Sequence, residues 1–425
     1  MEKALIQNEP GRGLIPRSRS RLFGIVVLGL AALFLVAACG ADPTPIPTAT
    51  PTPTTAPAAT AAATPTPEPT PTPEPFAPEG YGQSYEEIIA LAREETASEP
   101  LLYCQSTGPA QMLLKVKGFE ERYPGINTKV ERCRGTEIPQ RLLLEWRGGR
   151  IIFETTNVAR ELATQFLEAG AMDGPFNFEA LFPREYGIEG RRTDIGGVEG
   201  LALAQPMDVS ITALAFNRDT VPQERWPDAF ADCLDPYWSL RMTVDTRPTG
   251  LRMLGLPQLL GERFLLEELG TKLAANKPIW VRGQSRSRAQ FLAGELDFQC
   301  GVSVDSGMRD LVFPGSPIEL VVPREIRELG KIGATMGNGN IVFKGASKPN
   351  AALLVGTYMN SDLAEQPLLE DPIQMWSVAS SVPGSPMGKL LADLGLEALD
   401  LSDQEELILE LHNKLVEAWG FPTSR

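Results

Sequence analysis

The sequence predicts an α/β protein whose sheets are mostly parallel and flanked by helices. Three strand–helix units follow one another between residues 100 and 170, and such repeats build parallel sheets with right-handed crossovers. About 345 residues follow residue 80, enough for two domains of ordinary size. The preceding residues differ so strongly in composition that we expect them to lie outside the globular part.

The N-terminal segment, residues 1–38, has the features of an export signal. Four arginines up to Arg21 precede seventeen apolar or small residues, 22–38, and small residues come before the expected cleavage point. A permanent membrane span usually needs about 20 apolar residues. The run ends in "VAAC", which resembles the bacterial lipobox, so we expect Cys39 to be lipidated and anchored in the cell membrane. The alternative is an uncleaved signal anchor with an incidental cysteine.

Residues 39–80 are predicted to form a disordered tether after the lipidated cysteine. Residues 41–78 contain thirteen Pro and eleven Thr and no Lys or Arg. A segment this poor in large apolar side chains cannot offset its ordering entropy. Proline favours an extended spacer, which would reach on the order of 100 Å at this length.

Strands and helices then alternate along the chain. Strand 100–105 precedes a helix that Pro109 opens and the turn "YPG" ends at residue 125; proline is favoured in the first helical turn. Strand 127–133 with helix 138–149, and strand 151–154 with helix 158–170, repeat this unit.

Further strands are predicted at 241–245, 279–282, 296–302, 318–323 and 340–345, and helices at 250–260, 264–275, 287–294 and near 350–369. The last helix, 402–419, opens with Ser402 and Glu405 as a capping box. We expect Leu407, Leu411, Leu415 and Trp419 along its buried side.

Composition excludes several functions. With 54 Asp and Glu against 39 Lys and Arg, the chain has no electrostatic basis for general nucleic-acid binding. After lipidation four cysteines remain, which permits two disulfides whose pairing the spacing leaves open. No C-x-x-C pair is present and His412 is the sole histidine, so a zinc site built from Cys and His is not expected.

The chain resembles the extracellular solute-binding proteins of ABC importers, in the two-lobed type II group and its ferric-iron-type branch. The order of several motifs carries the resemblance. They are the opening at 101–150, "SITALAFNRDTVP" at 210–222, "LDPYWSLRMTVDTRPTG" at 234–250, "FLAGELDFQCGVSVD" at 291–305 and the stretch 339–366.

The resemblance implies two α/β lobes joined by two crossover strands, with a hinge and a central cleft. Lobe I would hold residues 81–209 and 315–425, and lobe II residues 210–314. A small molecule or ion would bind in the cleft and favour the closed form. An ABC permease would receive it, and the binding protein would be a monomer on the extracytoplasmic face of a bacterial membrane.

Ligands of open α/β sheets bind beyond the carboxyl ends of the strands. At the first such edge, Ser106, Thr107 and Gly108 precede a helix whose free N–H groups suit an anion; a simple helix cap is the alternative. Arg132 and Arg134 follow the second strand. These residues favour an anionic ligand, although surface arginines are often only solvated.

The second edge belongs to the strands expected in lobe II. Arg247, Thr249 and Gly250 follow strand 241–245 and precede a helix. Ser303 and Asp305 follow strand 296–302 and are expected to border the cleft, where Asp305 could also face a cation.

Iron is the alternative ligand. Ferric-binding relatives place adjacent tyrosines in the segment matching 301–307, as hard donors to a hard ion. Here residues 296–312 contain no tyrosine and no histidine. Iron or an iron complex would therefore need a site without tyrosine, and no resident metal or cofactor is predicted.

An enzyme is not predicted. Among the motifs absent are G-x-S-x-G, S-x-x-K and the P-loop, and His412 lies on the terminal helix. The remaining alternative to an importer subunit is a tethered surface domain that senses or adheres.

The type II topology places the first two strands side by side, which leads to one disulfide prediction. Cys104 and Cys133 end these strands, so their Cα atoms would be about 5 Å apart, within the range a disulfide needs. Two reduced thiols are the alternative. Cys233 with Cys300 is the weaker pairing.

Overall fold

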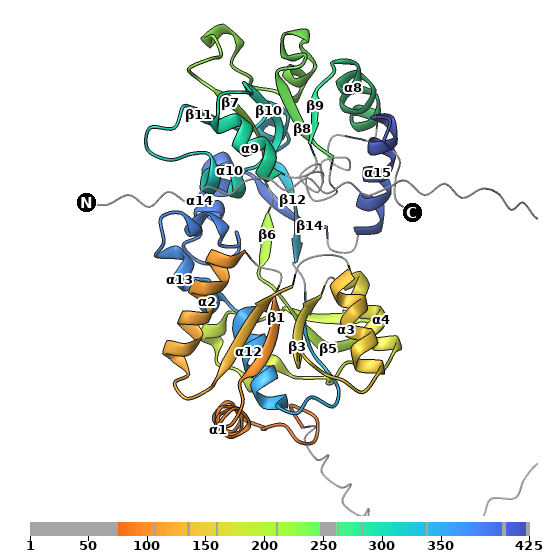
Figure 1. Ribbon diagram of the computed structural model, residues 1–425, viewed down its shortest axis with the longest axis vertical. Coiled ribbons are helices and arrows are strands. Elements are labelled where there is room, and N and C mark those ends of the chain that lie inside the picture. Colours follow the sequence, from red (N-terminus) through yellow and green to blue (C-terminus); the bar gives the residue numbers. More distant parts are fainter. Residues whose placement is uncertain are drawn as a thin grey trace, which may run out of the picture. The chain divides into compact units, whose positions relative to one another are not determined.

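The computed structural model describes residues 75–105, 108–133, 137–158, 160–209, 211–246, 261, 263–281, 284–336, 339–401 and 405–421. The expected signal segment, Cys39 and most of the tether lie outside these residues. The described chain contains one six-stranded, one five-stranded and one three-stranded sheet. The first two form the centres of two lobes, whose strands and helices can be followed in Figure 1.

Lobe I is built on the six-stranded sheet, in the order β2-β1-β3-β13-β5-β4. Its strands are β1 Leu101–Gln105, β2 Thr128–Arg132, β3 Thr155–Val158, β4 Arg192–Ile195, β5 Val198–Ala204 and β13 Gly339–Val342. Its helices are α1 Tyr85–Glu95, α2 Pro109–Arg122, α3 Glu137–Arg147, α4 Arg160–Glu168, α5 Phe178–Leu181, η1 Arg184–Tyr186, α12 Pro349–Met359, η7 Asp362–Ala364 and α13 Gln366–Leu369.

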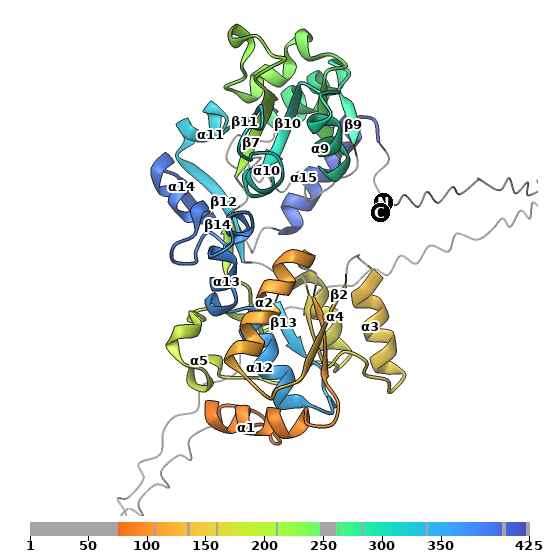
Figure 2. The same cartoon turned by 60° about the vertical axis from the view of Figure 1, so that its left-hand side comes forward.

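Two apolar clusters cover the two faces of this sheet. Along β1, Tyr103 packs with α12 and α1 on one face, whereas Cys104 packs with α3 and α4 on the other. Both residues are almost fully buried. Because side chains along a strand alternate between the two faces of the sheet, adjacent residues such as Tyr103 and Cys104 pack into different cores. Figure 2 shows α2 and α12 alongside this sheet.

Lobe II is built on the five-stranded sheet, in the order β11-β7-β10-β8-β9. Its strands are β7 Thr212–Asn217, β8 Met242–Asp245, β9 Ile279–Val281, β10 Phe298–Ser303 and β11 Ile318–Val321. Its helices are η2 Gln223–Arg225, η3 Phe230–Leu234, η4 Pro236–Trp238, the π-helix η6 Phe264–Lys272, α8 Leu273–Ala275, α9 Gln284–Leu292, α10 Val304–Asp310, α11 Arg324–Leu329, α14 Pro386–Leu394 and α15 Glu405–Ala418.

A hinge sheet connects the lobes. It has the order β14-β12-β6, with β6 Met207–Val209, β12 Lys331–Met336 and β14 Glu397–Asp400. β6 leads from β5 to β7, and β12 leads from α11 back to β13. These are the two crossover strands that the sequence resemblance implies. A third crossing runs from α13 through η8, Gln374–Ser377, to α14.

Both large sheets are mixed. β1 pairs in parallel with β2 and β3, and β8 with β9 and β10. β13 and β7 pair antiparallel with their neighbours, because each enters its sheet directly from the hinge. The strand–helix repeat therefore accounts for the parallel half of each sheet.

The expected lobe boundary at residue 315 is wrong. β11 pairs with β7 of lobe II, and Leu411, Leu415 and Trp419 of α15 are buried in the lobe II core. The chain returns to lobe I only through β12, so lobe I regains residues 339–369 rather than the whole C-terminal part. Leu407 was expected on the buried side of this helix, but it is 44% exposed.

Two local expectations also need correction. The third strand was expected at 151–154, whereas β3 spans Thr155–Val158. The predicted tether ends before residue 80, because Ala77 is buried in the lobe I core and the Phe76 carbonyl accepts a hydrogen bond from the Asn177 N–H at 2.8 Å.

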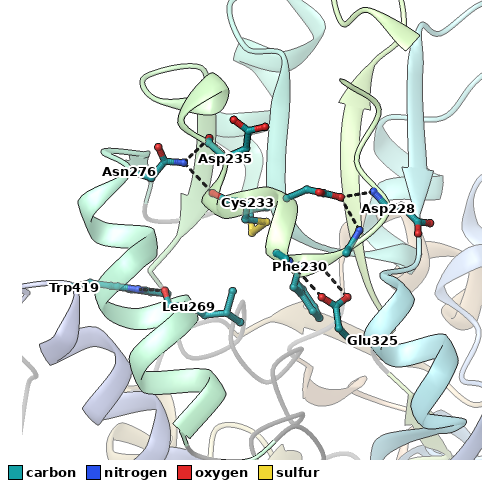
Figure 3. Close-up of a disulfide and its surroundings, with 12 residues drawn as sticks. Asp228, Phe230, Cys233, Asp235, Leu269, Asn276, Glu325 and Trp419 are labelled. Carbon is teal, nitrogen blue, oxygen red and sulfur yellow. Dashed lines mark hydrogen bonds between the residues drawn. A yellow bond between two sulfur atoms is a disulfide. The ribbon is translucent and has the colours of Figure 1, made fainter. Parts of the chain in front are cut away.

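Two disulfides are present in the part of the chain that the structure describes. Cys104 and Cys133 are bonded with a Cα–Cα distance of 5.5 Å, which confirms the prediction for this pair. Cys233 of η3 is bonded to Cys300 of β10, with Cα atoms 5.9 Å apart. Figure 3 shows the Asn276 amide donating to the carbonyls of Cys233 and Asp235, at 3.0 and 2.9 Å. η3 is thus held both to the sheet and to the end of α8.

Among the residues that the structure describes, no helix combines the length and the apolar character needed to span a bilayer.

Candidate functional site

The carboxyl edge of lobe I is formed by the ends of β1 and β2. These strands pair in parallel from Leu101 to Gln105, and the Cys133 N–H continues the pairing by donating to the Gln105 carbonyl at 2.9 Å. The Cys104–Cys133 disulfide crosses the same edge. The chain segments that leave β1 and β2 are therefore fixed to each other where they begin.

Gly108 begins α2 at this edge. Its N–H donates to the side-chain oxygen of Gln111 at 3.0 Å, so this donor is already used. A Cβ atom at position 108 would lie 2.7 Å from that same oxygen. Glycine therefore lets the start of α2 fold tightly against Gln111.

The carboxyl edge of lobe II is formed by β8 and β10. β8 ends at Asp245 and β10 at Ser303, and both side chains are buried. α10 starts directly after Ser303, and the Val304 N–H donates to the Ile211 carbonyl at 2.9 Å. α10 is thereby held to the chain entering lobe II from the hinge.

α10 and its neighbours carry a chain of charges. Asp310 accepts from Arg288 of α9 and from Arg309, the latter at 3.1 Å. Arg309 also donates to the Ser377 hydroxyl of η8 at 2.8 Å. Burial lowers the pKa of Arg288, and Asp310 opposes that change. Of the arginines described here, Arg288 and Arg309 thus both pair with Asp310, and Arg309 also contacts the third crossing.

Asp305 lies on the first turn of α10, and its side chain is partly exposed to solvent. Surrounding protein raises the pKa of its carboxyl, while hydrogen bonds from Ser306 and the nearby arginines oppose the rise. The Ser306 hydroxyl lies 3.2 Å from one carboxylate oxygen.

Asp208, on the hinge strand β6, is a second carboxylate close to Asp305. Its oxygen accepts from the Ser380 N–H at 3.3 Å. Surrounding protein and then the charge of Asp305 raise the pKa of Asp208 to about 7. Asp208 is nevertheless exposed to water, which screens part of the repulsion between the two carboxylates.

Other parts of the described chain fit a ligand site less well. A surface pocket of about 470 Å³ lies at the amino ends of β1 and β2, lined by Glu99, Glu120, Tyr123 and neighbouring residues. This is the opposite end of the strands from the one that binds ligands in open α/β sheets. Among the described residues, no group of three or more His, Cys, Asp or Glu is arranged to hold a metal ion.

Comparison with solved structures identifies the architecture. The iron-bound HitA from Pseudomonas aeruginosa has a TM-score of 0.51 and 16% identity, over 74% of this chain and 99% of that chain. The periplasmic binding protein AfuA from Actinobacillus pleuropneumoniae, solved with exogenous fructose-6-phosphate, has a TM-score of 0.52 and 17% identity, over 75% and 98%. The substrate-binding protein of an ABC transporter from Agrobacterium tumefaciens gives 0.52 and 14%, over 75% and 95%.

The fold is that of the type II periplasmic binding proteins. No family model matches the sequence, and no curated protein sequence matches it. The likeness therefore rests on the backbone. It agrees with the lobed α/β fold that the sequence predicts.

The structure describes only some of the sequence-predicted site residues, and these lie at the carboxyl edges of the two sheets. Gly108 lies at the lobe I edge, and Ser303 and Asp305 lie at the lobe II edge. Arg132 is the last residue of β2, but its side chain lies outside what the structure describes. The remaining predicted residues lie outside the described residues: Ser106, Thr107, Arg134, Arg247, Thr249 and Gly250.

Sequence reasoning missed Asp208, Arg288, Arg309 and Asp310. The i,i+4 spacing of Asp305 and Arg309 directly after a buried strand was a usable signal, since such positions share one helix face. Asp208 had no local signal, because its proximity to Asp305 depends on the hinge crossing.

Proposed function

We propose that this protein is a membrane-anchored, extracytoplasmic solute-binding protein of an ABC importer. It captures a small ligand in a cleft between its lobes and delivers it to a permease. The fold carries the proposal, because two separately cored lobes joined by a hinge sheet suit ligand-dependent closure. Two disulfides support export, since such bonds persist in oxidising compartments.

The ligand is an anion in this proposal. Arg132, Arg134 and Arg247 follow strands at the two carboxyl edges in the sequence, and Arg side chains bind carboxylates and phosphates through paired hydrogen bonds. Two described arginines near the carboxyl edge of lobe II, Arg288 and Arg309, are paired with Asp310. Recognition of the anion is therefore assigned to the arginines that follow the strands.

A screen of thermal stability tests this function. The full-length protein in detergent would be heated with oxyanions, carboxylates, polyamines, sugars and ferric complexes in turn. An anion that binds the folded state should raise the melting temperature in a concentration-dependent way. A response confined to ferric complexes would favour iron, and a protein that responds to none of these classes would favour a sensor or adhesion domain.

The arginines can then be tested individually. With an anion identified, Arg134→Ala and Arg247→Ala should each weaken binding by about 1–3 kcal/mol, the range for a desolvated charge-assisted hydrogen bond. Arg263→Ala is the matched control, because Arg263 is an exposed arginine paired with Glu267 on its own helix. Unchanged affinity in both variants, measured by calorimetry, would remove the anion assignment.

The membrane anchor is a separate part of the proposal. Cys39→Ala should give a chain without lipid, detectable by mass spectrometry and by loss of the membrane-bound fraction after signal cleavage. A membrane-bound fraction that persists in processed Cys39→Ala protein would contradict lipid anchoring through this residue.

A further inference from the structure

The two crossover strands run side by side from lobe I into the hinge sheet. In lobe I, Asn340 of β13 is paired with Leu203 of β5. In the hinge sheet, Met336 of β12 is paired with Met207 of β6. Because β5 leads into β6 and β12 leads into β13, these strands form one antiparallel ribbon of two strands. Both crossovers therefore leave lobe I at the same place.

The outgoing strand of this ribbon is interrupted where it leaves lobe I. In the described chain, β5 ends at Ala204 and β6 begins at Met207, so Gln205 and Pro206 belong to neither strand. Pro206 has no backbone N–H and cannot donate a hydrogen bond to a sheet ladder. A few residues at the ends of elements absorb most of the dihedral change when domains close. The ribbon can thus bend most readily at residues 205 and 206.

One buried side chain holds the ribbon just before this interruption. Asn360 caps the C-terminal end of α12 and is 0% exposed. Its Nδ2 donates to the Leu203 carbonyl of β5 at 2.6 Å, and its Oδ1 accepts from Nδ2 of Asn157, on β3, at 3.3 Å. In the sheet, β13 lies between these two strands, with Asn340 paired to Asn157 on one side and to Leu203 on the other. Asn360 therefore links the strands on both sides of β13.

The backbone of Asn360 is also held by lobe I. Its carbonyl accepts from Nη1 of Arg191 at 3.1 Å, and Arg191 also forms an ion pair with Asp362. The Arg191 carbonyl accepts in turn from the N–H of Ala204, the last residue of β5, at 3.0 Å. The helix that carries Asn360 is buried from Asn350 to Met359. The end of β5 is thereby joined to the core of lobe I.

Asn340 fixes the returning strand of the ribbon. Its Nδ2 donates to Oγ1 of Thr155, on β3, at 2.7 Å, and this hydroxyl donates to the Ile341 carbonyl at 2.7 Å. A Cβ atom at Gly356 of α12 would lie 1.8 Å from Nδ2 of Asn340. Glycine at this position therefore lets the amide pack against the helix backbone. Both strands of the ribbon are thus held by buried amides on the lobe I side of residues 205 and 206.

We propose that Asn360 is a positioning residue that sets where the hinge bends. It clamps the lobe I end of the ribbon, so movement of lobe II relative to lobe I is confined to residues 205 and 206 and to the hinge sheet beyond them. Without the clamp, bending extends into β5 and β13, and the lobes adopt a wider range of relative orientations. The inference rests on the proposed function only in that the lobes are taken to move relative to each other.

Single-molecule energy transfer between the lobes provides a test that needs no ligand. Dyes would be placed through non-natural amino acids at Glu99, in lobe I, and Glu295, in lobe II, which are both exposed, on the full-length chain in detergent. Asn360→Leu keeps a side chain of similar size and loses both side-chain hydrogen bonds. We expect it to broaden the distribution of interlobe distances. Hydrogen exchange in β5 and β13 should become about tenfold faster, as expected for the loss of a buried hydrogen bond.

Asn350→Leu is the matched control on the same helix. Asn350 lies near the start of α12, is 1% exposed, and bonds to Gly82 and Glu95 instead of the ribbon. This variant should lower the stability of lobe I and leave the width of the distribution unchanged. Asn360→Ala serves if Asn360→Leu does not fold. An unchanged width in the Asn360 variant, or equal broadening by Asn350→Leu, would overturn the clamp, and neither result depends on the ligand screen.

Discussion

Lys115 and Glu365 form an ion pair that is almost entirely buried. Their side chains are 6% and 7% exposed, and the nitrogen–oxygen distance is 2.6 Å. Removing one partner leaves the other charge buried without compensation, which typically costs about 3–5 kcal/mol. We expect Lys115→Met to lower the free energy of unfolding by about 3 kcal/mol, measured by chemical denaturation.

Lys117 provides the control on the same helix. It pairs with Glu121 at 3.6 Å, and both side chains are more than two-thirds exposed. Exposed pairs of this kind contribute less than about 1 kcal/mol, so Lys117→Met should change stability little. Equal losses in the two variants would show that burial of the Lys115 pair has no special effect.

At the residue scale, the sequence can propose site residues only where their position next to a strand in the chain is enough. Ser303 and Asp305 were predicted because they follow an apolar strand expected at 296–302, and β10 ends one residue later, at Ser303. Asp208 was not predicted, since its partner Asp305 is far away in the sequence and is brought close by the packing around the hinge.

At the scale of elements, the Cys104–Cys133 disulfide joins the ends of β1 and β2 across a sequence separation of 29 residues. Cross-linking a loop of this size stabilises by about 3–4 kcal/mol in the chain-entropy model. We expect the double variant Cys104→Ser with Cys133→Ser to lose about that much stability. Hydrogen exchange should increase first at the carboxyl ends of β1 and β2.

The second disulfide supplies the comparison. Cys233 and Cys300 lie in the lobe II core, so replacing both by Ser should raise exchange in η3 and β10 and leave β1 and β2 protected. Equal loss of protection in β1 and β2 from both double variants would contradict separate roles for the two bonds.

Elements with a strong local pattern were predicted best. Helix α2 begins at Pro109 as its proline indicates, and β1, β2 and β10 fall within a residue or two of their expected ranges. β6, β12 and β14 were not predicted, because their pairing partners are distant in sequence and β6 and β14 are also short. The third strand was placed too early, since "IIFE" is apolar but the paired residues are the threonine-rich segment that follows.

At the scale of the whole molecule, the lobes have separate cores although the chain crosses between them repeatedly. The buried lobe II core combines residues from 209 to 332 with residues from 387 to 419. The resemblance placed the C-terminal part in lobe I, because the number and position of crossings cannot be read from strand and helix patterns. The sequence of α15 shows that one face is apolar, but it does not indicate which lobe this face packs against.

Trp419 at the end of α15 tests whether the lobes lose structure independently. It is 7% exposed, its indole N–H donates to the Leu269 carbonyl at 3.1 Å (Figure 3), and its ring lies 4.9 Å from that of Trp280. Replacing a buried Trp by Ala costs about 3–5 kcal/mol. Because all these contacts are in lobe II, Trp419→Ala should raise hydrogen exchange in η6, β9 and α15 while β1, β3 and α12 stay protected. Leu407→Ala, on the exposed side of the same helix, should leave exchange in both lobes unchanged. Loss of protection in β1 and β3 together with α15 would show instead that the hinge couples the two lobes into one unfolding unit.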